Sequence, residues 1–218
     1  MIETILPRVA VSAEAFGDPP EATLYPGEEA IVARAVASRR REYTTARHCA
    51  RLALRDLGHA PVAIPTGEKG EPVWPPGVVG ALTHCSGYRA AALAPAARIT
   101  ALGIDAEPHV PLPDGVLEAV ARPEELSHLG ALRRCAPEVH WDRLLFSAKE
   151  SVYKAWFPLA RRRLDFTDAT LLFDCASRTF RATLHQQGPT VHDRPLTSMT
   201  GQWLVTKGLI TTSVAITP

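Results

Sequence analysis

Residues 140–157, HWDRLLFSAKESVYKAWF, decide the fold, because they carry the most regular helical pattern in the chain. Apolar residues recur at helical spacing along one face, and Pro158 is expected to end the helix. This face consists of Trp141, Leu144, Leu145, Ala148, Val152 and Ala155. The bulky residues Tyr153, Trp156 and Phe157 leave few sides of the helix for water, which predicts that the helix is buried.

Three charged residues, Lys149, Glu150 and Lys154, interrupt this apolar helix. Glu150 and Lys154 are four residues apart, and on an exposed helix they would form an ordinary ion pair worth about 0.3–0.5 kcal/mol. On a buried helix, charges without partners are costly. The three side chains are therefore candidates for surrounding a bound anion and a bound cation.

The remaining pattern mixes helices and strands. Residues 28–57 have an apolar stripe that predicts a second long helix, with Gly58 as its stop, and a short helical stretch is expected at 115–121. Strands are expected at 78–83, 90–94, 99–105, 169–173, 179–184, 201–206 and 209–216, with Lys207 and Gly208 turning the last hairpin. This order predicts an α+β fold with antiparallel sheets.

The composition excludes several classes of protein. The chain has 218 residues, of which 46% are hydrophobic, and its 24 basic and 23 acidic residues nearly cancel. Such a balance argues against a protein that coats nucleic acid or a membrane surface. No apolar run is long enough for a membrane helix, and the N-terminus lacks the pattern of a signal peptide, so we expect a cytoplasmic protein. The four scattered cysteines predict reduced thiols rather than a zinc site.

A pair of acids ends the strand-like stretch ALGIDAEPH, residues 101–109. Asp105 and Glu107 are two residues apart, so in an extended chain both project from the same face. A solvated turn would explain an isolated pair of this kind. Together with Glu150, however, the pair makes a set of hard oxygen ligands that suits Mg²⁺, which recruits substrate phosphate oxygens. We therefore expect a magnesium clamp, with the lysines neutralising phosphate charge.

These segments resemble the signature of the 4′-phosphopantetheinyl transferases, which modify carrier proteins with coenzyme A. GIDAE at 103–107 is followed by FSAKESVYKAW at 146–156, and both match the family's G-[IV]-D-x-E and [FW]-x-x-K-E-[SA]-x-[YFW]-K patterns. Upstream, TGEKGEPVWP at 66–75 and ALTHCSGY at 81–88 resemble two further family segments, and RHCARLAL at 47–54 is similar to the actinobacterial branch. Blocks in this order resemble the larger, single-chain type.

The resemblance implies a pseudo-twofold monomer with the active site between two similar halves, 1–106 and 107–218. Each half would pack a long helix on a small antiparallel sheet. It also implies that Asp105, Glu107 and Glu150 hold Mg²⁺, with Mn²⁺ as an alternative, on the coenzyme A pyrophosphate. Glu150 is expected to deprotonate the carrier serine, directly or through a metal-bound water, and Lys149 and Lys154 to neutralise the transferred and leaving phosphates.

Further residues are assigned to coenzyme A by the same resemblance. Thr83 and His84 match the segment that contacts a coenzyme A phosphate. The family draws charge for the 3′-phosphate from an upstream helix and loop, where Arg guanidinium groups suit bidentate binding. The candidates here are Arg39 or Arg40, Arg47 and Lys69, although a solvated basic face would also explain them. Two positions depart from the pattern, namely Ala106 within D-x-E and Cys85 after His84.

The expected activity is transfer of the 4′-phosphopantetheine arm of coenzyme A to a serine of apo acyl, polyketide or peptidyl carrier proteins, releasing 3′,5′-ADP. Arg161, Arg162 and Arg163 could attract an acidic carrier helix or form a solvated run. Two alternatives stay open at this point: a metal-dependent nuclease or phosphohydrolase, and a non-catalytic protein that binds coenzyme A or a carrier domain. No nucleic-acid or membrane partner is expected.

Overall fold

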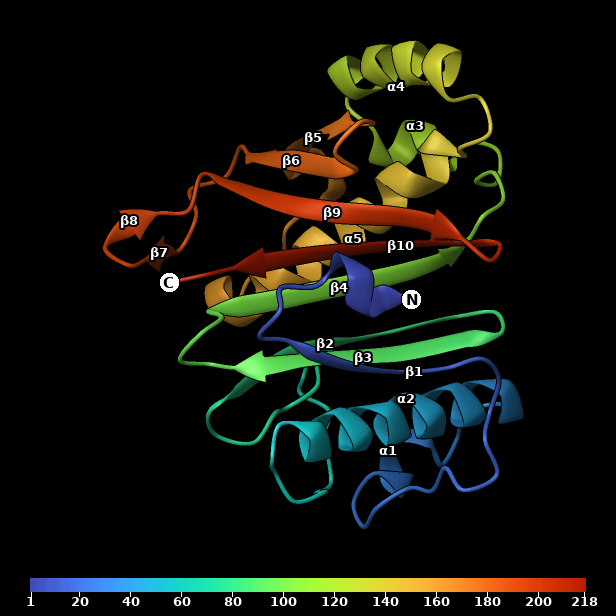
Figure 1. The fold of residues 1–218 in the computed structure, drawn as a ribbon, viewed down its shortest axis with the longest axis vertical. Coiled ribbons are helices and arrows are strands. Elements are labelled where there is room, and N and C mark those ends of the chain that lie inside the picture. Colours follow the sequence, from blue (N-terminus) through green and yellow to red (C-terminus); the bar gives the residue numbers. More distant parts are fainter.

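The computed structural model describes residues 1–218 and contains two main antiparallel sheets that lie next to each other (Figure 1). The smaller sheet has the order β1-β3-β2, formed by Val11–Ala15, Tyr88–Pro95 and Val78–Cys85. The larger has the order β4-β10-β9-β6-β5, formed by Ala101–Pro108, Leu209–Ile216, Ser198–Thr206, Thr179–Leu184 and Ala169–Asp174. A small hairpin, β7 (Thr190–Val191) and β8 (Arg194–Pro195), projects at one side. The predicted α+β class is confirmed.

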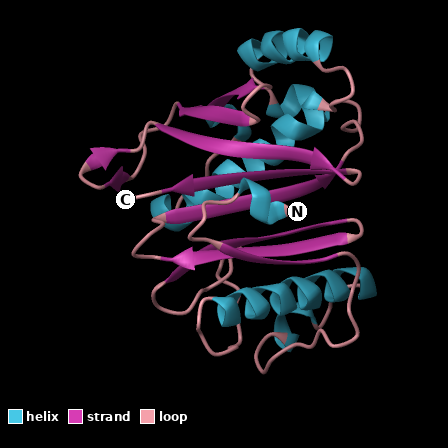
Figure 2. Ribbon diagram, in the orientation of Figure 1, coloured by secondary structure: helices cyan, strands magenta, loops and turns pink.

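One long helix belongs to each sheet (Figure 2). Helix α2, Ala37–Asp56, packs on the three-stranded sheet, and helix α5, Trp141–Ala160, packs on β4 and β10 of the five-stranded sheet. The short 3₁₀ helix η1, Ile2–Ile5, contributes Ile2 and Ile5 to the apolar cluster between the sheets. No helix is long and apolar enough to cross a bilayer.

The helix predicted over 28–57 is divided in two. Helix α1, Glu29–Val32, is separated from α2 by the turn at 33–36, which ends at Val36 with an extended backbone. The turn allows α1 to fold back onto α2, where the buried Glu28 carboxylate accepts a hydrogen bond of 3.0 Å from Arg51. Glu28 also accepts the Ile64 N–H, so this buried ion pair ties the following loop to α2. Apolar periodicity alone could not predict the break, because the ion pair depends on tertiary structure.

The prediction that Pro158 ends helix α5 is wrong by two residues. Pro158 lies inside the helix, which continues to Ala160 and stops where Arg161 adopts a left-handed backbone with φ of 50°. A proline removes one helical hydrogen bond and its ring crowds the carbonyl four residues earlier, which is costly, but its fixed φ is helical. The helix therefore continues past Pro158 for a further two residues.

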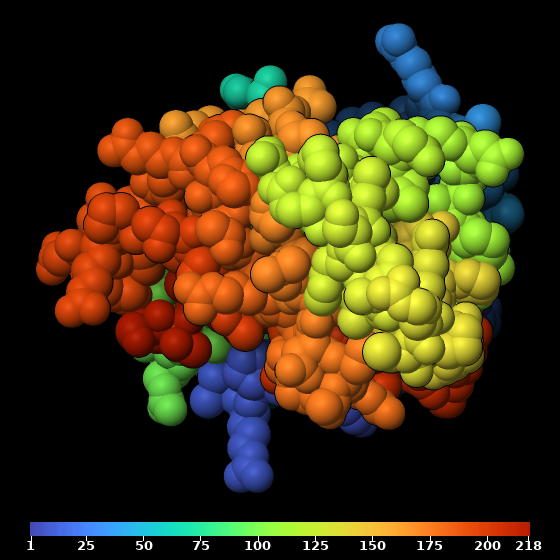
Figure 3. Space-filling model, turned by 90° about the horizontal axis from the view of Figure 1, so that it is seen from above, coloured from blue at the N-terminus to red at the C-terminus, as the bar shows by residue number.

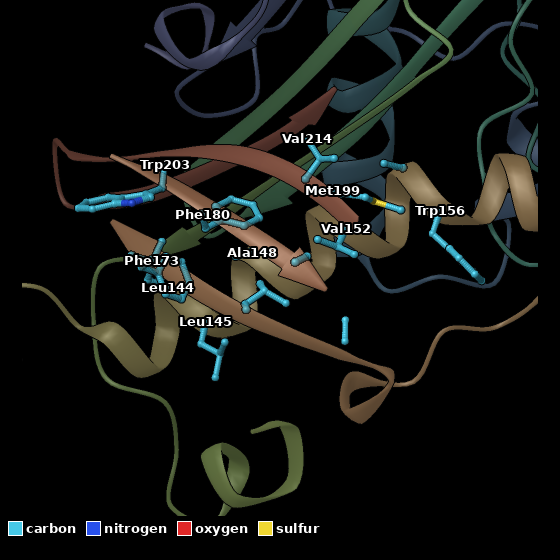
Figure 4. Packing of buried hydrophobic residues seen from close by; sticks show 14 of the residues in the cluster. Leu144, Leu145, Ala148, Val152, Trp156, Phe173, Phe180, Met199, Trp203 and Val214 are labelled. Atoms are coloured by element: carbon cyan, nitrogen blue, oxygen red, sulfur yellow. The ribbon is translucent and has the colours of Figure 1, made fainter. Parts of the chain in front are cut away.

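The core of the larger sheet is built on the apolar face of α5. Figure 4 shows Leu144, Ala148 and Val152 of α5 facing strand residues that include Phe173 and Phe180. Helix α3, Val116–Val120, matches the short predicted helix, whereas α4, Pro123–Cys135, was not predicted. The 3₁₀ helix η2, Phe166–Asp168, leads into β5. Figure 3 shows that α3 and α4, in green to yellow, cover the molecule beside the orange segment that contains β5 and β6.

Strand β4 lies at the junction of the two sheets. Its side chains alternate: Leu102 and Ile104 belong to the apolar cluster under β2 and β3, whereas Ala101 packs with α5. Gly103 shares the α5 side, where a Cβ atom would overlap the backbone of Ser151. The predicted boundary at residue 106 falls within this strand, which pairs with β10 throughout. The division into halves 1–106 and 107–218 and their pseudo-twofold relation stay predictions.

Candidate functional site

A cleft of about 980 Å³ lies between helix α2 and strand β2 on one side and strand β4 and helix α5 on the other. Its walls come from α2, the loop at 66–74, β2, β4 and α5. Of the residues assigned to the site from the sequence, all but Arg40 and Lys149 line it: Arg39, Arg47, Lys69, Thr83, His84, Asp105, Glu107, Glu150 and Lys154. Segments distant in sequence thus converge on one site.

Asp105 is the most deeply buried acid of the cleft, with 5% of its surface exposed. Its Oδ1 accepts a hydrogen bond of 2.8 Å from Lys154 Nζ and one of 3.3 Å from Thr83 Oγ1. Its Oδ2 is buried without any hydrogen-bond partner. Buried carboxylate oxygens in proteins are normally satisfied, so this one marks a place for a ligand.

Glu107 bonds to a residue that the sequence did not single out. Arg143 Nη1 donates to Glu107 Oε2 at 2.9 Å, while its Nε and Nη2 donate to the carbonyls of Val110 and Pro111. Burial and Asp105 raise the pKa of Glu107, and Arg143 opposes this shift. The only sequence signal for Arg143 was its position two turns before Glu150 on the same helix.

Glu150 lies on α5 and borders the cleft. Burial raises the pKa of Glu150 above its usual value, and the negative charge of Asp105 adds to the shift, whereas Lys154 opposes it. A carboxylate with a raised pKa binds a proton readily, which suits a general base.

The acids fit a bound cation without forming a finished three-ligand site. No three acidic, histidine or cysteine side chains are gathered closely enough to hold a metal ion. The partnerless Asp105 Oδ2 and the half-buried carboxylates of Glu107 and Glu150 are nevertheless hard oxygen donors. Mg²⁺ suits such a set because it commonly takes one or two carboxylates and completes its shell with water and phosphate oxygens.

On the opposite wall, His84 and Arg39 form a close pair. Arg39 Nη1 donates to His84 Nε2 at 2.6 Å, which requires a neutral imidazole with its proton on Nδ1. Burial, followed by the charge of Arg39, lowers the pKa of His84. Glu42 lies 3.6 Å from Nδ1. Arg39 thus faces the cleft, whereas Arg40 is exposed and does not line it.

Arg47 is buried in the cleft wall, where it holds the next loop. Its Nε donates to the Ile64 carbonyl at 3.0 Å, its Nη2 donates to Thr66 Oγ1 at 2.8 Å, and its guanidinium lies over the Tyr43 ring. These contacts, which could not be predicted from the sequence, attach the loop at 64–66 to α2. Binding of a phosphate by Arg47 stays a prediction.

The Lys149 ammonium is bound by protein acceptors, and its predicted contact with a phosphate stays a prediction. Its Nζ donates to Glu125 Oε2 at 2.9 Å, to the Phe166 carbonyl and to the Ala169 carbonyl at 3.0 Å. An ammonium group has three donors, so these three acceptors use them all. Lys149 therefore joins α5 to α4 and to the start of β5, and it does not line the main cleft. The sequence could not predict this because Glu125 lies on the unpredicted helix α4.

A second cavity of about 460 Å³ adjoins the cleft and shares Glu150, Tyr153 and Lys69 with it. Apolar residues such as Phe157 and Phe166 line it together with the run Arg161–163. No pattern along the chain indicated this cavity. Cys85 follows His84 at the end of β2, and burial raises the pKa of its thiol to about 12, so this departure from the family pattern is a neutral group.

Comparisons with known proteins agree with the arrangement of the site. Residues 27–94 match the family model of the 4′-phosphopantetheinyl transferase N-terminal domain, and residues 101–204 match that of the 4′-phosphopantetheinyl transferase superfamily. The chain is 50% identical to the 4′-phosphopantetheinyl transferase Svp of Streptomyces mobaraensis, over 99% of this chain and 89% of that protein.

Two further relatives are similar over nearly their whole length. The chain is 48% identical to the 4′-phosphopantetheinyl transferase Npt of Nocardia iowensis, over 99% of both proteins. It is 44% identical to the 4′-phosphopantetheinyl transferase PptT of Mycobacterium tuberculosis, over 99% of this chain and 98% of that protein. Both family models and all three relatives agree, and the chain belongs to the 4′-phosphopantetheinyl transferase superfamily.

Proposed function

We propose that this protein transfers the 4′-phosphopantetheine arm of coenzyme A to a serine of apo acyl, polyketide or peptidyl carrier proteins and releases 3′,5′-ADP. Membership of the family supports the reaction class. The single observation that carries the assignment to this cleft is the buried, partnerless Asp105 Oδ2 beside Lys154 and Glu150. The proposal takes the protein as a cytoplasmic monomer.

Asp105, Glu107 and Glu150 would hold Mg²⁺ or Mn²⁺ in this proposal. When bound, the ion would neutralise negative charge on the pyrophosphate as the phosphate bond breaks. Lys154 would turn from Asp105 to a phosphate oxygen, and Glu150 would accept the proton of the carrier serine. Arg39, His84 and Lys69 would bind the phosphates of coenzyme A on the opposite wall, with Arg47 holding that wall in place.

This chemistry needs no covalent intermediate on the protein. The serine oxygen attacks the phosphorus atom next to the pantetheine arm, its proton passes to Glu150, and 3′,5′-ADP leaves. The acceleration would come from holding both substrates in line and from neutralising charge.

The test is the intact mass of an apo carrier protein after incubation with this protein, coenzyme A and Mg²⁺, with EDTA in a parallel sample. The proposal predicts the addition of one phosphopantetheine, which EDTA prevents. If the mass stayed unchanged for acyl, polyketide and peptidyl carriers alike, the result would contradict the proposed activity.

A further inference from the structure

The two oxygens of the Asp105 carboxylate lie in different surroundings. Oδ1 accepts hydrogen bonds from Thr83 Oγ1 at 3.3 Å and from Lys154 Nζ at 2.8 Å. Oδ2 is equally buried but has no partner. Both protein donors therefore lie on one oxygen, which leaves the other available for a cation.

The direction of the Thr83 hydroxyl is set by a second hydrogen bond. Its oxygen accepts the backbone N–H of Ala106 at 2.9 Å. The only other polar partner of this hydroxyl is Asp105 Oδ1, so its single proton points to that oxygen. Thr83 lies on β2 of the smaller sheet, while Asp105 and Ala106 lie on β4 of the larger. One hydroxyl thus connects the two sheets at the site.

Thr83 and Lys154 differ in their freedom to move. Only 2% of Thr83 is exposed, whereas 26% of the Lys154 side chain is exposed toward the cleft. A bound phosphate can draw the flexible lysine away from Asp105, but it cannot draw away a short, buried threonine. Thr83 is then the donor that remains on Oδ1.

We propose that Thr83 is a positioning residue for the metal site: its hydroxyl fixes Asp105 through Oδ1 so that Oδ2 is presented to the divalent cation. This rests on the proposed function, since the cation is the one used in transfer. It differs from the role implied by family resemblance, in which Thr83 contacts coenzyme A itself.

Mn²⁺ binding tests this role without turnover. The full-length protein is titrated with Mn²⁺, alone and with coenzyme A, and free Mn²⁺ is followed by electron paramagnetic resonance. Thr83→Val removes the hydroxyl at nearly constant shape, Thr83→Ala removes it and leaves space, and Thr83→Ser keeps it. Circular dichroism and thermal unfolding establish that each variant is folded, and if Thr83→Val does not fold, Thr83→Ala carries the comparison.

Thr45→Val is the matched control. Thr45 is also a buried threonine that donates to an aspartate, at 2.8 Å to Asp18 Oδ1, but it lies on α2 and does not line the cleft. The same chemical change there removes a comparable hydrogen bond. A loss of metal affinity that comes from general destabilisation would appear in both Thr83→Val and Thr45→Val.

Removal of a group that orients a metal ligand typically weakens metal affinity about 10- to 100-fold. We expect such a loss in Thr83→Val and Thr83→Ala, affinity near that of the unaltered protein in Thr83→Ser, and no loss in Thr45→Val. Equal affinity in Thr83→Val and Thr45→Val would overturn the inference, as would a Thr83→Ser protein as weak as Thr83→Val. Failure of the unaltered protein to bind Mn²⁺ under both conditions would overturn this inference and the proposed metal site together, while the carrier mass assay would still decide the transfer reaction separately.

Discussion

Gly103 lies so close to the carbonyl oxygen of Ser151 that any side chain at this position would overlap helix α5. The first residue of the G-I-D-x-E segment therefore sets how closely α5 approaches β4. Asp105 projects from the same face of the strand two residues later, next to Lys154 of that helix. Because Gly103 has no Cβ atom, α5 packs close enough to β4 for Lys154 to contact Asp105.

Replacing Gly103 with alanine should force α5 away from β4. Overpacking of a close interface typically costs 1–3 kcal/mol, so we expect the free energy of unfolding to fall by about that amount. Transfer activity should fall further, since Asp105 and Lys154 would separate. Urea unfolding and the carrier assay measure the two effects. Gly130→Ala is the control: it lies on α4 with open space around its Cβ position, and helix propensity predicts a gain of up to about 1 kcal/mol. Equal stabilities for both variants would contradict the close packing.

Arg39 and Arg40 provide a matched pair for coenzyme A binding. Arg39 lines the cleft and bonds to His84, whereas its neighbour Arg40 is exposed and does not line the cleft. Loss of a charge-assisted hydrogen bond of about 1.5 kcal/mol corresponds to roughly a tenfold weaker affinity. Arg39→Ala should therefore raise KM for coenzyme A about tenfold, while Arg40→Ala should change it little. Steady-state kinetics give both values, and a larger effect at Arg40 would reverse the assignment.

Lys149→Met should damage stability rather than chemistry. Glu125 has 0% of its surface exposed, and the substitution would leave it without its lysine partner. Loss of one partner of a buried ion pair typically costs about 3–5 kcal/mol. The double variant Lys149→Met, Glu125→Gln removes the stranded charge and should regain part of this loss. Unfolding curves and kcat per folded molecule separate the roles. If the single variant stayed fully stable but lost turnover, Lys149 would act on phosphate after all.

Glu150→Gln should abolish transfer and leave weakened binding of coenzyme A. A general base typically contributes a factor of about 10²–10⁴, so we expect at least a hundredfold drop in kcat. Intact-mass kinetics of the carrier measure transfer, and calorimetry measures binding of coenzyme A. The result also separates an enzyme from a non-catalytic coenzyme A binder, because a pure binder has no turnover to lose.

As the pH is lowered, activity should be lost at a pH above the range in which a glutamate side chain ordinarily titrates. Burial raises the pKa of both Glu107 and Glu150, and the protonated forms can neither bind a cation nor accept a proton. Because metal and proton compete for the same carboxylates, more Mg²⁺ should move this acidic limb to lower pH. Arg143→Met should move it to higher pH, since Arg143 holds the pKa of Glu107 down. If neither added Mg²⁺ nor Arg143→Met moved the acidic limb of the rate profile, Glu107 and Glu150 would be excluded as the groups that titrate there.

Much of the fold was predictable because hydrophobic periodicity marks elements with one buried face. This holds for α5, α2 and most strands, and the turn at Lys207 and Gly208 has both residues at positive φ, as a tight hairpin requires. Helix α4 was missed because it is largely polar, although Pro123 at its first position was a readable signal. Strand β1 is short and only half buried, so it shows no clear alternation.

The site was predictable where local geometry decided it. Asp105 and Glu107 share a strand face, and Glu150 and Lys154 follow each other by one helical turn. The hydrogen-bond and ion-pair partners of Lys149, Thr83 and Glu107 come from distant segments: Glu125, Ala106 and Arg143. No pattern along the chain states which distant group will neutralise a buried charge, because that depends on how the elements pack.

The cleft divides its charges between two structural units. The wall formed by α2 and the loop at 66–74 supplies Arg39 and Lys69, whereas β4 and α5 supply the acids and Lys154. A ligand that reaches from Arg39 to Asp105 would contact both units and would bind only the folded protein, in which they are correctly placed. Such binding stabilises the folded state against unfolding. A bound substrate would thus hold together the two walls of its own binding cleft.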